Sequence, residues 1–189
     1  MALGVGANNA ATINLFENSV YLNVNGGVTQ SSAASPGVFN SSLFDFQQGL
    51  GTLSVEITSA GQNYVSLFVD HEVDEPVNTF FNELGSAIGT PAAGQTWEID
   101  EPGYAGGDIF ANFEASMLDN TVGFIFPAGD DVSMALAWKF ALNAGERAKL
   151  EFILSDAAPT SGSAIGFQLA QNDPDSAVTI YFSSKIEIL

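Results

Sequence analysis

The sequence predicts a mainly β chain, with residues 1–189 forming a single antiparallel β-sandwich, jelly-roll or Ig-like in general shape, and one or two short helices on crossovers. Three observations predict it. Apolar residues mostly recur at every second position, turn-forming Gly, Asn and Pro interrupt these runs at short intervals, and 46 % hydrophobic residues with 15 Phe provide a core. Many short alternating runs separated by turns are typical of two packed sheets.

Two strands are predicted in the first half of the chain. Segment 52–58 alternates apolar residues with Ser54 and Glu56, which predicts a strand with one buried face. Segment 64–70 is apolar at most positions of both alternating sets, so we expect this strand to be buried on both faces and to end at Asp70.

Two segments depart from this alternation and predict short helices. The first begins with a proline after two acidic residues, ends before Gly85 and has apolar residues at i, i+3, i+4 and i+7: Val77, Phe80, Phe81 and Leu84. The second would begin at Asp108 as its N-cap and end near Asn120, with three apolar residues on one face: Phe110, Phe113 and Met117.

The C-terminal third predicts about four strands in an antiparallel meander. Alternating apolar residues occupy segments 132–140, 148–154, 165–169 and 178–182. Asn143-Ala144-Gly145 lies between the first two segments and indicates a hairpin turn.

The charge distribution excludes several classes of partner. The chain has 22 acidic and four basic residues, and residues 1–138 contain no Lys or Arg. Nucleic acids and anionic membrane surfaces are therefore not expected as partners, because both are bound through Lys and Arg. The chain has no cysteine, which excludes disulfides and thiol chemistry.

The acidic residues suggest sites for a divalent cation. In an extended segment Asp70, Glu72 and Asp74 would point to the same side, where their carboxylates repel unless an ion lies among them. Ca²⁺ binds six to eight oxygen ligands and suits such a group. The alternative is that these acids favour the start of the following helix and a solvated loop.

A second acidic group consists of Glu98, Asp100, Glu101 and Asp108 in a Gly-rich stretch. Either a loop that holds a metal or a plain turn explains it equally well. We take Asp100 and Asp108 as candidate Ca²⁺ ligands. Neither acidic group has the spacing of an EF-hand loop.

Catalytic signals are weak. His71 is the single histidine, it has acidic neighbours that should raise its pKa and keep it protonated, and no G-x-S-x-G motif is present. Paired carboxylates for glycoside hydrolysis remain an alternative. In that case Trp97 and Tyr104 would form a platform for a sugar ring beside Glu98 or Asp100.

Five segments together resemble exported bacterial proteins of the PEP-CTERM class. They are FVDHEVDEPVNTFFNELG (68–85), GTPAAGQTWEIDEPGY (89–104), GDIFANF (107–113), DDVSMALAWKFALNAGERAKLEFILSD (130–156) and FQLAQNDPDSAVTIYFSS (167–184). The resemblance covers roughly residues 50–184. It implies a domain preceded by a signal peptide and followed by a Pro-Glu-Pro sorting signal that an exosortase processes. The chain has neither, so we expect it to be the mature domain.

The resemblance also implies a secreted or cell-surface location in a biofilm, floc or exopolysaccharide matrix, and it brings no catalytic residues. The predicted function is therefore that of an extracellular matrix protein that acts by interaction, through self-association, polysaccharide binding or both, with Ca²⁺ as a stabilising ion. The alternative is a carbohydrate-active enzyme or lectin-like module that uses the carboxylates near Trp97.

Overall fold

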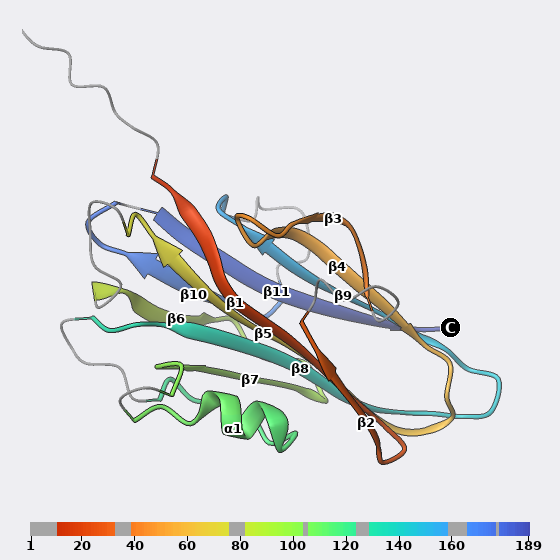
Figure 1. Ribbon diagram of the computed structural model, residues 1–189. Coiled ribbons are helices and arrows are strands. Elements are labelled where there is room, and N and C mark those ends of the chain that lie inside the picture. The colour runs from red at the N-terminus through yellow and green to blue at the C-terminus, as the bar shows by residue number, and fades with distance from the viewer. Residues whose placement is uncertain are drawn as a thin grey trace, which may run out of the picture.

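The computed structural model describes residues 11–32, 39–75, 82–103, 106–123, 129–158, 166–176 and 178–189. Within these residues the predicted antiparallel β-sandwich is confirmed, since two antiparallel sheets pack face to face with one short helix beside them (Figure 1). Sheet A has the order β2 (Gly27–Ser31), β1 (Ile13–Val24), β5 (Gly61–Val73), β8 (Ser133–Leu142) and β7 (Gln95–Asp100). Sheet B has the order β3 (Asn40–Asp45), β4 (Leu50–Ile57), β9 (Ala148–Ser155), β11 (Val178–Ile188), β10 (Gln168–Asp173) and β6 (Leu84–Ile88).

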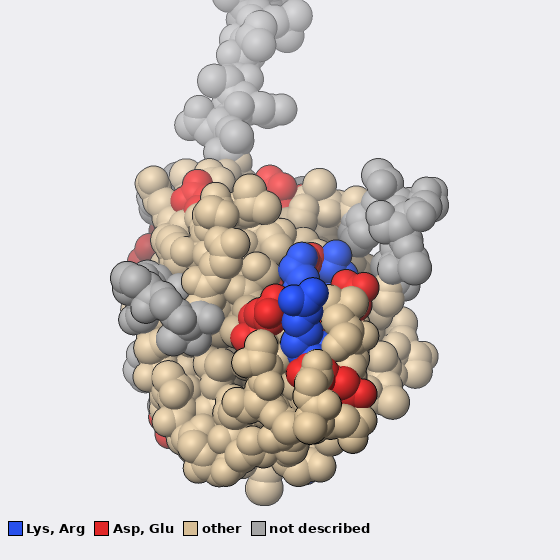
Figure 2. Space-filling model, turned by 90° about the vertical axis from the view of Figure 1, so that its right-hand side faces the viewer, with Lys and Arg blue, Asp and Glu red and all other residues tan. Residues whose placement is uncertain are grey.

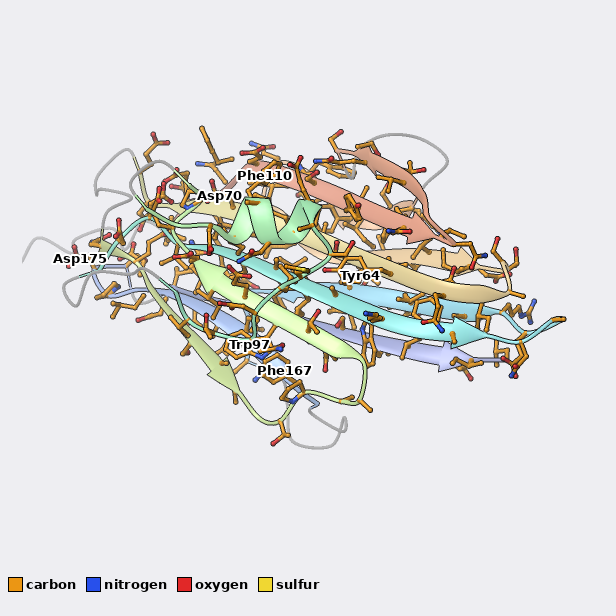
Figure 3. All side chains as sticks on the ribbon, turned by 90° about the horizontal axis from the view of Figure 1, so that it is seen from below. Tyr64, Asp70, Trp97, Phe110, Phe167 and Asp175 are labelled. Atoms are coloured by element: carbon orange, nitrogen blue, oxygen red, sulfur yellow. The ribbon has the colours of Figure 1, made fainter. Side chains whose placement is uncertain are left out.

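The main core fills the space between the sheets. Alternate residues of the central strands point into it, including Leu67 of β5, Leu136 of β8 and Phe152 of β9. Trp97 of β7 packs against Phe167 with ring centroids 5.3 Å apart (Figure 3). Burial of such large apolar side chains from both sheets is what stabilises the two layers against each other.

A second, smaller apolar cluster covers the outer face of sheet A, which is the face turned away from sheet B. Helix α1 (Ile109–Glu114) lies on this face and buries Ile109 and Phe113 against Tyr64 and Phe68 of β5. This is why β5 is buried on both faces, as the sequence predicted. The strand continues three residues beyond the predicted end at Asp70.

The helix from Asp108 is shorter than predicted. Asp108 is the N-cap residue but makes no side-chain capping hydrogen bond, and α1 ends at Glu114. The predicted apolar face is also partly wrong, because Met117 is 67 % exposed whereas Ile109 is buried. The other predicted helix falls largely on residues 76–81, outside the described part, and Leu84 and Gly85 begin strand β6 instead.

The predicted C-terminal meander is wrong in its connectivity. The turn at Asn143-Ala144-Gly145 does not close a hairpin, because β8 belongs to sheet A and β9 to sheet B. β9 pairs with β4 and β11, so the chain crosses from one sheet to the other at this turn. Alternation shows which residues are buried in each strand and does not show which strand is the neighbour.

Candidate metal centre

Two groups of carboxylates lie side by side on the outer face of sheet A, at the end where β7 stops. Asp70 of β5 pairs with Ser133 of β8, and Ser133 pairs in turn with Asp100 of β7. Residues directly opposite in neighbouring strands point to the same face of a sheet. The row Asp70, Ser133 and Asp100 therefore places two acidic side chains on one surface, with a serine between them.

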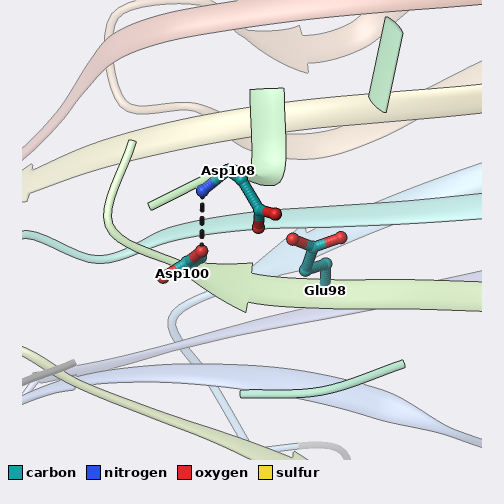
Figure 4. Close-up of side chains that lie close together, drawn as sticks. All are labelled: Glu98, Asp100 and Asp108. Atoms are coloured by element: carbon teal, nitrogen blue, oxygen red, sulfur yellow. Dashed lines mark hydrogen bonds between the residues drawn. The ribbon is translucent and has the colours of Figure 1, made fainter. Parts of the chain in front are cut away.

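The first group consists of Glu98, Asp100 and Asp108, here called the triad (Figure 4). One carboxylate oxygen from each residue lies within 4.8 Å of those of the other two. Glu98 and Asp100 are buried, with 1 % and 2 % of their surfaces exposed, while Asp108 is exposed. The triad therefore has an open side through which an ion can enter.

Short local hydrogen bonds hold the triad in place. The N–H of Asp108 donates to Asp100 Oδ2 at 2.9 Å, which brings the start of α1 against the end of β7. Glu98 accepts hydrogen bonds from the Asn112 side chain at 3.0 Å and from the Asp119 N–H at 3.2 Å. Burial nevertheless raises the pKa of Glu98 to about 7, since no cationic side chain is near it among the described residues.

The loop that joins β7 to α1 is organised around Glu101. Its Oε2 atom accepts three backbone N–H bonds, from Gly103 at 3.1 Å, Gly106 at 3.1 Å and Gly107 at 3.0 Å. A Cβ atom at Gly107 would lie 1.8 Å from the carbonyl oxygen of Glu101, so the loop closes only with glycine there. Tyr104, a predicted sugar platform, lies outside the described residues.

The second group consists of Asp70, Glu72 and Asp131, here called the inner group. Glu72 lies two residues beyond Asp70 on the same face of β5, and Asp131 precedes β8 by two residues at the same end of the strand pair. Burial is the main cause that raises the pKa of Asp70 to about 8, of Glu72 to about 7 and of Asp131 to about 6. Repulsion from Asp131 adds to the shift of Asp70 and of Glu72. Each of these carboxyls is therefore easier to protonate than a carboxyl in water.

The basic residues lie at the opposite end of the sandwich and cannot neutralise these acids. Figure 2 shows Lys and Arg gathered in one patch bordered by acidic side chains. Lys149 and Lys185 both contact Glu151, at 2.8 and 2.7 Å. Lys139 is six residues along β8 from Ser133, which is about 20 Å at ~3.3 Å per residue.

Glu83, a buried acid that sequence reasoning did not select, lies at the same end of the molecule. Its backbone forms a bridge with Asp130, and its Oε2 atom accepts hydrogen bonds from the Val132 N–H at 3.3 Å and the Gln171 side chain at 2.6 Å. Burial raises the pKa of Glu83 to about 9. No sequence signal could have found it, because its position depends on how residues 82–88 meet two distant segments.

Asp74, the third predicted ligand of the Asp70 group, lies apart from Asp70 and Glu72. Asp74 turns away into a left-handed conformation, with φ of 54°, and its Oδ1 atom accepts hydrogen bonds from both the N–H and the hydroxyl of Thr12.

The expectation of a protonated His71 is wrong. Its ring is fully buried on the inner face of β5, opposite to Asp70 and Glu72, and burial lowers its pKa to about 4.

Trp97 does not serve as a platform for a sugar ring. It is 9 % exposed and belongs to the core between the sheets, whereas the neighbouring Glu98 points to the outer face. Successive residues of a strand project to opposite faces, so the two side chains cannot contact the same ligand. The lectin or glycosidase alternative therefore loses Trp97 as one of its two predicted platform residues.

Comparison with known proteins found no match: no family model, no curated protein and no solved structure is similar to the chain. The described residues include no helix long and apolar enough to cross a membrane.

Proposed function

We propose that this chain is a Ca²⁺-stabilised β-sandwich that acts by interaction in an extracellular matrix, with an ion bound at the triad. The observation that carries the proposal is the convergence of the Glu98, Asp100 and Asp108 carboxylates within 4.8 Å. Their mutual repulsion is relieved when a cation binds among them.

The chemistry of the donors favours Ca²⁺ over other metals. The triad offers only carboxylate oxygens, the ligands that Ca²⁺, Mg²⁺ and Mn²⁺ prefer, and no Cys or His nitrogen that Zn²⁺ would select. Ca²⁺ tolerates irregular geometry and a large number of ligands, whereas Mg²⁺ requires a near-ideal octahedron. The unequal surroundings of the three carboxylates, two buried and one exposed, suit the more tolerant ion.

The exposed sheet edges support an interaction role. Edge strands β2 and β6 contain no charged residue, and apolar side chains on them are exposed: Val28 at 55 %, Leu84 at 37 % and Ile88 at 40 %. Charged side chains, Lys above all, are the usual means by which proteins prevent edge-to-edge pairing. Self-association through these edges is the interaction we propose, with matrix polysaccharide as a further partner.

The edge at β7 differs from these two. Residues 120–123 cover it, since the Asn120 N–H donates to the Trp97 carbonyl at 2.8 Å and the Gly123 N–H to the Ile99 carbonyl at 2.7 Å. An edge strand covered in this way cannot pair with another chain. Sheet A therefore offers its β2 edge for pairing.

The ion is tested by thermal unfolding in millimolar Ca²⁺ and in EGTA. A free ion concentration a hundredfold above Kd stabilises the fold by about 2.7 kcal/mol, which raises Tm by roughly 5–10 °C for a chain of this size. Asp108→Asn should abolish most of this shift, and it should leave Tm in EGTA nearly unchanged because the Asp108 side chain makes no capping bond. Asp156→Asn, which changes an exposed acid in a loop, is the matched control. An equal Tm for the unchanged protein in both solutions would contradict the proposal.

A further inference from the structure

The outer edge of β7 is closed by the segment that follows α1, residues 116–123, here called the strap. The strap runs parallel to β7, whereas the strands of sheet A all pair antiparallel. The N–H of Trp97 donates to Asn120 Oδ1 at 3.1 Å. The N–H of Ile99 donates to the carbonyl oxygen of Thr121, also at 3.1 Å. The strap therefore occupies the place where a sixth strand would pair with sheet A.

Little buried surface holds the strap. Leu118, 4 % exposed, is its single buried residue. Ser116 and Asn120 have φ angles of 59° and 65°, a left-handed conformation that residues other than glycine seldom adopt. A segment with few buried apolar contacts and solvent-exposed hydrogen bonds opens at a lower free energy than the sheet it covers. We therefore expect the strap to open and close while sheet A stays intact.

The strap also contacts the two buried carboxylates of the triad. Glu98 Oε2 accepts a hydrogen bond from the Asp119 N–H at 3.2 Å. A Cβ atom at Gly123 would lie 2.6 Å from the carboxyl carbon of Asp100 and 2.7 Å from both its oxygens, so the backbone of the strap rests against this carboxylate. Closure of the strap thus holds the two triad side chains that β7 supplies.

We propose that closure of the strap over β7 is coupled to ion binding at the triad, so that Ca²⁺ locks the strap shut. This inference rests on the proposed function, since it takes the ion at the triad as given. When the strap opens, Glu98 loses the Asp119 N–H and Asp100 loses the backbone packed on it, and the carboxylates move apart under their mutual repulsion. The open form therefore binds the ion more weakly. By thermodynamic reciprocity, the ion favours the closed form by the same factor.

Loss of the ion would then turn β7 into a pairing edge. In the open form, Trp97 and Ile99 present backbone N–H and C=O groups that the strap no longer satisfies. Such a row of groups is a template for another strand, and a strand of a second copy of this chain is the partner we propose. Sheet A would offer β2 for pairing with or without Ca²⁺, and β7 only without it.

The test is residue-resolved amide hydrogen exchange of the full chain, in EGTA and at free Ca²⁺ a hundredfold above Kd. In EGTA, Trp97 and Ile99 should exchange faster than Thr96 and Glu98. The amides of alternate residues in β7 point toward β8 and stay paired when the strap opens. Ca²⁺ should slow exchange at Trp97 and Ile99 by up to about a hundredfold, because the strap opens only after the ion has left. Asp108→Asn, which removes an ion ligand, should lose this effect of Ca²⁺.

Leu118→Ala tests the strap without changing a charge. It removes the buried anchor, so exchange at Trp97 and Ile99 in EGTA should be about tenfold faster or more. Met117→Ala, at a 67 % exposed position of the strap, is the matched control and should exchange like the unchanged protein. In EGTA, Leu118→Ala should also associate more strongly than Met117→Ala in sedimentation velocity. Equal association of the two variants would overturn pairing through β7.

The outcomes separate the strap from the triad. If Trp97 and Ile99 exchange as slowly in EGTA as Thr96 and Glu98, the strap does not open by itself and the inference is overturned. If Ca²⁺ raises Tm but leaves fast exchange at Trp97 and Ile99 unchanged, the ion binds and only the coupling is overturned. If Ca²⁺ does not change Tm, the proposed function fails and the lock fails with it.

Discussion

The side chain of Gln171 joins the two sheets through the His71 carbonyl and also binds Glu83. Gln171 lies on β10 of sheet B, and its amide donates to Glu83 Oε2 at 2.6 Å and to the backbone oxygen of His71, on β5 of sheet A, at 2.7 Å. It is 1 % exposed, so these two hydrogen bonds are formed away from water. The amide of Gln171 thus links β10 to both β5 and the segment of Glu83 at the acidic end of the sandwich.

Replacing Gln171 with Leu should lower the free energy of unfolding by about 1–3 kcal/mol, because two buried acceptors lose a donor that water cannot replace. Urea unfolding at pH 7 measures this. Gln168→Leu on the same strand is the control, since Gln168 is also buried but its side-chain amide donates no hydrogen bond within the described residues. Equal losses in the two variants would show that the Gln171 hydrogen bonds do not contribute.

The buried carboxyls predict that stability in EGTA falls as pH rises from 7 to 9. Burial raises the pKa of Glu83 from 4.5 to about 9 and that of Asp70 from 3.8 to about 8. The folded chain therefore holds protons that the unfolded chain has lost, and this stability disappears as pH passes the folded values. Each such proton gives a slope of about 1.4 kcal/mol per pH unit. His71, with its pKa lowered to about 4, does not titrate in this range.

Glu83→Gln should reduce that slope by up to one proton, and Asp156→Asn should leave it unchanged. Urea unfolding at pH 7, 8 and 9 in EGTA measures the effect. A slope that is the same in Glu83→Gln and in the unchanged protein would show that the Glu83 carboxyl is ionised in the folded chain.

Gly107→Ala should destabilise the fold by about 1–3 kcal/mol and weaken Ca²⁺ binding at the triad. The added Cβ would collide with the Glu101 carbonyl, so the loop must open and move Asp108 away from Asp100. Gly166→Ala is the control, because nothing lies within 4 Å of a Cβ there. Unchanged Ca²⁺ affinity in Gly107→Ala would show that the loop does not position the triad.

Val28→Lys should reduce self-association without affecting the monomer. Val28 is 55 % exposed on edge strand β2, where a Lys side chain would extend into solvent and oppose pairing with another chain. Sedimentation velocity at increasing concentration measures the effect. Met117→Lys makes the same change at a 67 % exposed position away from any strand and should associate like the unchanged protein. Equal association of all three proteins would exclude the β2 edge.

The sequence could predict the architecture and most of the buried faces. Alternation identified Leu53, Val55 and Ile57 as buried, and all three are. It could not predict that β8 and β9 lie in different sheets, since a turn of Asn, Ala and Gly suits a hairpin and a crossing equally well.

For the candidate site, the sequence identified acidic residues but not their groups. Asp70 and Asp100 were taken from separate segments, and only the strand register brings them into one row. Asp131 was not among the predicted ligands, and the pairing of β5 with β8 is what brings its segment to the end of β5 that carries Asp70. Trp97 was misjudged because a lone aromatic residue gives no sign of which face of its strand is buried.

The pairing of distant segments has a consequence for the order of folding. β4 lies between β3 and β9, and Leu53 faces Phe152, about a hundred residues later in the chain. β5 likewise lacks its β8 neighbour until residues 133–142 have been made. A chain synthesised from its N-terminus therefore cannot complete sheet A until about three-quarters of it has emerged, and sheet B must also wait for β11. Such long-range pairing makes folding slow. During this interval the many acidic and few basic residues of the emerging segment keep like-charged chains apart.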